Sequence, residues 1–148
     1  MRKKFFDKLY EEMSKDETIV LITADLGYGI LDKIRTNYPE RFFNVGAAEQ
    51  TMLGVAIGFY YSGKKPFCYT ITPFYERAFE AITLYLKDAV VKLIGSGVGN
   101  DYMADGISHW ERTKLPLKYN IDIDNFIDRK STRLNSSHTD ISRMPSSA

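Results

Sequence analysis

Cysteine is nearly absent from this sequence, which has a single one, Cys68, among its 148 residues. One cysteine cannot form an intrachain disulfide, so the disulfide-stapled classes of small secreted protein are excluded. Cys68 lies in the apolar run PFCYTI and is expected to be a small core residue in a reducing compartment, the cytoplasm by default. No group of Cys and His has the spacing of a metal site, so no metal is expected on this chain.

Long apolar runs and charge of one sign are also missing. Lys, Asp or Gly interrupts the apolar stretches every few residues, which excludes a membrane-spanning helix and a signal peptide. The formal net charge is +1 and no long run of charges of one sign occurs, which argues against binding to nucleic acid or to a membrane surface. The glycines of GSGVGND have neither Walker nor dinucleotide-fingerprint spacing, and no nucleophile elbow is present.

Residues 128–148 differ in composition from the rest of the chain. They are rich in Ser, Thr and Arg, lack apolar periodicity and are expected to be disordered. The stretch resembles a translated sequencing adapter, so we exclude it, including His138, from fold and site predictions. We expect residues 1–127 to be one domain, truncated at its C-terminal end.

Hydrophobic periodicity predicts alternating helices and strands. Apolar residues at helical spacing indicate helices, and continuous β-branched or aromatic runs indicate buried strands. The expected helices are residues 2–15, 30–37, 47–61 and 74–86, and the expected strands are 18–24, 42–45, 66–71 and 90–94. Because strand and helix alternate four times, the expected fold class is α/β, a three-layer, mostly parallel sheet with helices on both faces.

The stretch 42–58, FFNVGAAEQTMLGVAIG, is the expected centre of the domain. Its helix is apolar on nearly every face, which is typical of a buried helix. Glu49 lies near the helix start, where a carboxylate in apolar surroundings should be desolvated, paired, or both. Alternatively, Glu49 only complements the positive end of the helix dipole, which is worth about 0.3–1 kcal/mol.

The carboxyl ends of parallel strands meet at one edge of a sheet, where ligands bind in such folds. Chemically distinctive residues follow each expected strand. They have ordinary structural explanations too, as a loop cap, as core or interface aromatics, or as a polar pair in a turn. These residues are Asp25, Glu49, Phe74, Tyr75, Asp105, Ser108 and His109.

Three motifs carry a family resemblance. The run NVGAAEQTMLGVAIGFYYSGKKPFCYTITPF resembles the pyrimidine-binding domain of transketolase and of related thiamine-diphosphate enzymes. The start, DETIVLITADLGYGIL, is similar to the C-terminal subunit of two-gene transketolases, and DGISH is similar to the substrate loop of the family. The resemblance covers residues 1–112 and implies the pyrimidine-type thiamine-diphosphate-binding fold.

The resemblance also implies roles for individual residues. Glu49 matches the catalytic glutamate that hydrogen-bonds a ring nitrogen of the cofactor's aminopyrimidine and holds a proton there. Phe74 matches the aromatic residue that stacks on that ring. Asp105 and His109 match residues that contact the donor sugar, and His109 is also expected to be catalytic. Further cofactor-pocket positions are Asp25, Ile71 and Arg77.

Only part of the family's active site is expected on this chain. Relatives hold the diphosphate and its Mg²⁺ with a Gly-Asp-Gly motif, which this sequence lacks. A partner subunit or domain that binds the diphosphate is therefore expected, in a homodimer or heterotetramer. Thr51 and Trp110 depart from the usual family residues, which bears on substrate preference.

The resemblance implies a transketolase-like enzyme that transfers a two-carbon ketol unit between phosphosugars. A 1-deoxyxylulose-phosphate synthase-type or pyruvate dehydrogenase β-type subunit is an alternative within the same superfamily. A catalytically inactive pyrimidine-domain scaffold is a further alternative, and a generic nucleotide-binding α/β module is the least favoured.

Overall fold

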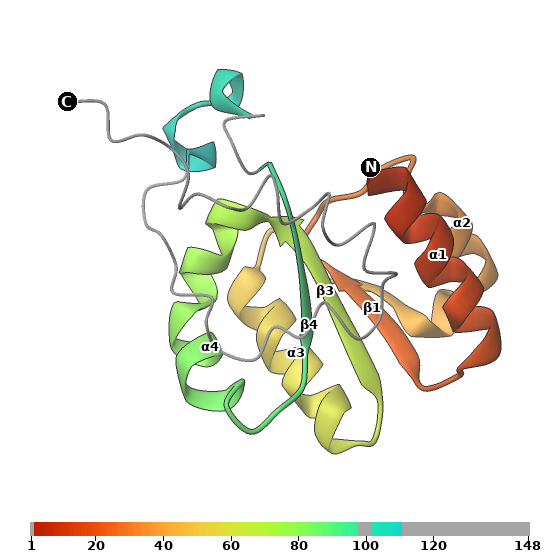
Figure 1. The fold of residues 1–148 in the computed structure, drawn as a ribbon. Coiled ribbons are helices and arrows are strands. Elements are labelled where there is room, and N and C mark those ends of the chain that lie inside the picture. The colour runs from red at the N-terminus through yellow and green to blue at the C-terminus, as the bar shows by residue number, and fades with distance from the viewer. Residues whose placement is uncertain (1, 98–101, 111–148) are drawn as a thin grey trace, which may run out of the picture.

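The fold is a parallel β-sheet between two layers of helices (Figure 1). The computed structural model describes residues 2–97 and 102–110. The strands, in the sheet order β2-β1-β3-β4, are β2 (Phe42–Asn44), β1 (Ile19–Thr23), β3 (Lys65–Ile71) and β4 (Lys92–Ser96). The α-helices are α1 (Arg2–Lys15), α2 (Asp32–Asn37), α3 (Glu49–Tyr61) and α4 (Phe79–Tyr85). The 3₁₀ helices are η1 (Pro39–Arg41), η2 (Thr72–Ala78), η3 (Met103–Asp105) and η4 (Ile107–His109).

Each face of the sheet has its own core. Ile19 and Leu21 of β1 pack with α1 and α2, whereas Val20 and Ile22 pack with α3 and α4. Successive side chains of a strand point to opposite faces, so a continuous apolar run fits a strand that is covered on both sides. The predicted three-layer α/β fold is therefore confirmed.

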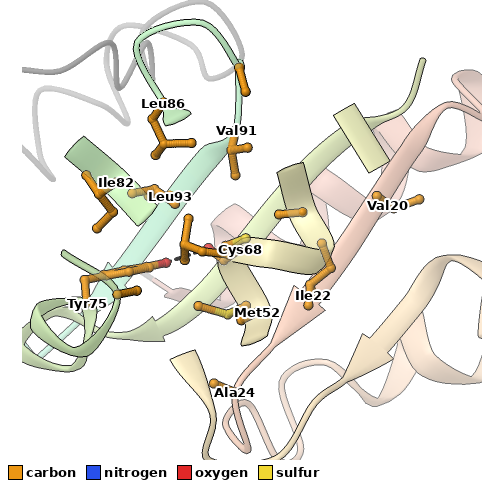
Figure 2. Close-up of a cluster of buried hydrophobic side chains, with 14 residues drawn as sticks. Val20, Ile22, Ala24, Met52, Cys68, Tyr75, Ile82, Leu86, Val91 and Leu93 are labelled. Carbon is orange, nitrogen blue, oxygen red and sulfur yellow. Dashed lines mark hydrogen bonds between the residues drawn. The ribbon is translucent and has the colours of Figure 1, made fainter. Parts of the chain in front are cut away.

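The core between the sheet and helices α3 and α4 contains Cys68 and Tyr75 (Figure 2). Cys68 is fully buried, and this burial raises the pKa of its thiol, so the group stays protonated and unreactive. Its predicted role as a small core residue is confirmed. Burial likewise raises the pKa of Tyr75, whose hydroxyl lies 2.9 Å from the Cys68 carbonyl oxygen and 3.0 Å from that of Ile94.

Two predicted elements are displaced along the chain. The expected strand 90–94 begins later, at Lys92, and Val90 is 47% exposed. Gly95 and Ser96 are weak strand formers, but pairing with Thr70 and Ile71 of β3 extends β4 over them. The expected helix 74–86 begins as η2 and becomes α-helical only at Phe79.

Helix α3 is not buried on all sides, so the prediction of a fully buried helix was wrong. One face contacts the sheet and η2, with Glu49, Met52, Leu53 and Ala56 buried. The opposite face includes Gln50, Thr51, Gly54 and Gly58, which are exposed. Within the described residues, this chain covers only one side of an apolar helix.

Helices α1 to α4, within the ranges described, are each too short or too polar to cross a membrane.

Asp16 at the base of the sheet gives a pH prediction. Its carboxylate accepts hydrogen bonds from Lys65 Nζ (2.7 Å) and from the Thr18 amide and hydroxyl groups, which lower the pKa of Asp16 to about 2. Because the unfolded pKa is about 3.9, this stabilisation is present above about pH 4 and is lost as the pH falls toward 2. The Asp16 side chain is 29% exposed, so solvent screening limits the effect to about 1 kcal/mol.

The measurement is urea unfolding of the wild type and Asp16→Asn at pH 7 and at about pH 2.5. We expect the wild type to be more stable at pH 7 and this advantage to shrink at low pH. Asp7→Asn removes an exposed carboxylate that pairs with Lys3 on α1 and serves as the control. An advantage that is equal at both pH values would contradict the assignment.

Candidate functional site

The candidate site lies at the carboxyl-terminal edge of the sheet, where the loops after the strands converge. The Asn44 side chain at the end of β2 connects two of these loops. Its Oδ1 accepts hydrogen bonds from the backbone N–H groups of Asp25 and Gly46, both at 3.0 Å. Asp25 has a left-handed backbone with φ of 51°, and this amide contact stabilises the turn after β1.

An ion pair with a buried carboxylate forms the centre of the site. Glu49, the first residue of α3, is only 1% exposed. Nη1 of Arg77 donates to both carboxylate oxygens, at 3.1 Å to Oε1 and 2.9 Å to Oε2. The carboxylate is therefore both desolvated and paired, as expected for a charge in apolar surroundings. The Arg77 side chain is 49% exposed, so only the acidic partner is buried.

Aromatic rings extend the site from this pair. The guanidinium carbon of Arg77 lies 4.2 Å from the centre of the Phe74 ring, a cation–π contact. The ring of His109 also packs on the Phe74 ring. The two ring centroids are 4.9 Å apart and the ring planes are inclined by 59°. His109 Nδ1 lies 3.1 Å from the Ser108 hydroxyl oxygen. Glu49, Arg77, Phe74 and His109 thus form one continuous set of contacts.

The geometry of η2 explains why Phe74 and Arg77 project together. A 3₁₀ helix has three residues per turn, so residues i and i+3 lie in line. Phe74 and Arg77 therefore lie on one side of η2, at the candidate site. Tyr75 and Ala78 lie on another side of η2 and are buried in the core. The Tyr75 hydroxyl fixes this orientation through the carbonyl oxygens of β3 and β4.

Other residues expected at the site lie apart from this set. Asp25 and Asp105 are exposed, and no hydrogen bond or ion pair within residues 2–97 and 102–110 connects their carboxylates to the four residues above. Ile71, at the end of β3, is 5% exposed. Its side chain is close to Gly97, where an added Cβ would lie 3.4 Å from Ile71 Cγ2. No cluster of three metal-ligating side chains occurs within those ranges.

Tyr102 is a residue of this edge that the sequence analysis missed. Its ring centroid is 6.3 Å from that of His109, and its hydroxyl accepts a hydrogen bond from Arg2 of α1. Gly97 has φ of 80°, and a Cβ there would lie 2.3 Å from Tyr102 Cδ2. The glycine run before Tyr102 was the available signal, because only glycine allows this close approach.

Known proteins are similar to this chain in sequence and fold. The family model described as "Transketolase, pyrimidine binding domain" matches residues 1–115. A protein of Methanocaldococcus jannaschii named as a transketolase C-terminal section is 38% identical over 114 residues, which are 74% of this chain and 36% of the relative. A 6-deoxy-6-sulfo-D-fructose transketolase subunit of Clostridium sp. is 33% identical over 125 residues, 82% of this chain and 39% of the relative.

A solved structure is similar as well. It is described as a split gene transketolase, inactive beta4 tetramer, and aligns with a TM-score of 0.58 and 36% sequence identity. The alignment covers 64% of this chain and 32% of that chain. The present chain therefore spans between 32% and 39% of the length of these proteins.

Proposed function

We infer the function from one premise, that the chain belongs to the transketolase pyrimidine-binding domain family. Members of this family depend on thiamine diphosphate, and we propose that this chain binds the aminopyrimidine half of that cofactor. The enzyme would transfer a two-carbon ketol unit between phosphosugars. The observation that carries the proposal is the buried Glu49 carboxylate, which Arg77 connects to the Phe74 ring at the edge of the sheet.

The residues present fit an aminopyrimidine. This group is flat, carries ring nitrogens and needs both a carboxylate partner and an aromatic face. The guanidinium of Arg77 is also flat and nitrogen-rich, and it contacts the Glu49 carboxylate and the Phe74 ring at once. A planar nitrogen group is thus already accommodated between these two side chains.

Each side chain would have a distinct task. When bound, the cofactor supplies the carbon nucleophile that carries the ketol unit. Glu49 would hold a proton at a carboxylate oxygen that faces a ring nitrogen, and Phe74 would orient the ring. His109 contacts Phe74, so it would lie close enough to the reacting end to hydrogen-bond the sugar.

The remaining expected residues would act at the rim. Asp105 is exposed next to η4 and would contact hydroxyl groups of the donor sugar. Asp25 lies in the loop that follows β1, Ile71 is the last residue of β3, and both remain proposed pocket residues.

The site requires a partner. This sequence has no Gly-Asp-Gly motif, so a second subunit or domain would hold the diphosphate and Mg²⁺. Helix α3 supports an assembly, because its apolar residues Val55, Ile57 and Phe59 are only partly buried by the described residues of this chain. The curated relatives are named for transketolase, which favours ketol transfer over the synthase and dehydrogenase alternatives.

Cofactor binding tests this proposal. We expect calorimetry with thiamine diphosphate and Mg²⁺ to detect tight binding when the full-length chain is mixed with its diphosphate-binding partner, and not with either alone. ADP with Mg²⁺ is the control for general diphosphate binding. Absence of cofactor binding by the mixture, or equal binding of ADP, would reject the proposed function.

A further inference from the structure

Arg77 occupies the place that the proposed function gives to the aminopyrimidine. We propose that Arg77 is an internal competitor for that ring, and that its side chain must leave Glu49 and Phe74 before the cofactor can bind. The inference rests on the proposed function of this site. It makes Arg77 a competitor for the site, whereas the family resemblance implies a cofactor-pocket residue at this position.

The first argument is geometric. One nitrogen of Arg77 engages both oxygens of Glu49, while the guanidinium carbon is 4.2 Å from the centre of the Phe74 ring. The side of Phe74 that faces Glu49 is therefore the side that Arg77 covers. A second flat group cannot stack on the same side at the same distance and also reach the same carboxylate.

The second argument concerns burial. Glu49 is 1% exposed, so its carboxylate needs a donor at all times, whereas Arg77 is 49% exposed and can be solvated as soon as it leaves. Replacing the guanidinium by a ring nitrogen that shares a proton with the carboxylate satisfies both conditions. The guanidinium thus keeps the Glu49 carboxylate paired and blocks access to it until the aminopyrimidine ring takes its place.

The third argument concerns how Arg77 would move. Tyr75, two residues before it, is 2% exposed and hydrogen-bonded to β3 and β4. The η2 backbone is thereby held in place, and Phe74 with it. The exchange therefore requires only rotations about the long Arg77 side chain, which are fast for an exposed group.

The test uses the aminopyrimidine fragment 4-amino-5-hydroxymethyl-2-methylpyrimidine, which lacks the diphosphate and so does not need the partner subunit. Its dissociation constant is measured by NMR titration of the full-length chain. Arg77→Met removes the competing nitrogens, and we expect about 10-fold tighter binding, the factor for a site that is free about a tenth of the time. Weaker or unchanged binding by Arg77→Met would overturn the inference.

Arg77→Lys provides a second variant that still pairs with Glu49 but has no flat face for Phe74. It should also bind the fragment more tightly than the wild type, and it remains informative if Arg77→Met fails to fold.

Phe74→Leu separates the two proposals, because it should weaken fragment binding if the aminopyrimidine site is correct. Unchanged fragment binding by Phe74→Leu would reject the site itself. If Phe74→Leu binds the fragment more weakly but neither Arg77 variant binds it more tightly, only the competitor role is rejected.

Discussion

Glu49→Gln is expected to lower turnover of the assembled enzyme by about 10²–10⁴-fold and to leave its fold intact, because a positioned proton transfer is worth this much. Glutamine has the same shape, and its carbonyl oxygen can still accept from Arg77. The amide cannot hold an exchangeable acidic proton at the position of the carboxylate. The loss would therefore appear in the activation of the cofactor rather than in folding or assembly.

The measurement is the exchange rate of the thiazolium carbon's proton, followed by NMR in the assembled wild type and variant. Glu80→Gln is the matched control, because Glu80 is an exposed glutamate in the first turn of α4. If Glu49 has only a structural role, both variants should keep their chemistry, whatever stability Glu49→Gln loses at its contact with Arg77. Equal exchange rates in Glu49→Gln and wild type would exclude a role in activation.

Tyr75→Ala is expected to destabilise the domain by about 3–5 kcal/mol, the range for removal of a large buried aromatic side chain. Tyr75 is 2% exposed in the core between the sheet, α3 and α4 (Figure 2). Tyr75→Phe keeps the ring and removes only the hydroxyl that links the two strands. Its expected cost is about 1–3 kcal/mol.

Urea unfolding monitored by circular dichroism measures both variants. Tyr28→Phe is the control, because Tyr28 is 94% exposed and should change stability by less than about 0.5 kcal/mol. A Tyr75→Phe variant as stable as the wild type would show that the hydroxyl does not anchor η2. In that case the fixed backbone invoked for the movement of Arg77 would also lose its support.

The sequence was most informative where local pattern and tertiary packing agree. Helix α1 has its expected bounds, and the β-branched run of β1 is buried on both faces. The expectation that Glu49 is desolvated and paired is confirmed, but its partner was not predictable. Arg77 lies 28 residues away, and only the 3₁₀ geometry of η2 turns it toward the carboxylate.

Helical periodicity of 3.6 residues misled the analysis in this segment. The expected α-helix over residues 74–86 would place Phe74 on one face with Ala78 and Ile82. The observed three-residue period of η2 instead groups Phe74 with Arg77 and separates it from Tyr75. The family resemblance is confirmed. The expected site roles stay predictions for every residue named, Glu49, Phe74, Arg77, Asp25, Ile71, Asp105 and His109. Residues 111–148, with the proposed adapter-like tail, lie outside the described part of the chain.

The period of η2 also limits how this segment can diverge. Insertion or deletion of one residue between Thr72 and Tyr75 would turn the following side chains by about 120°. Tyr75 would then face the candidate site, and Phe74 or Arg77 would be forced into the hydrophobic interior. Substitutions at positions 74 and 77 leave the register of η2 unchanged. In related sequences the candidate site can therefore vary through substitution of these residues, but not through a change in the length of this segment.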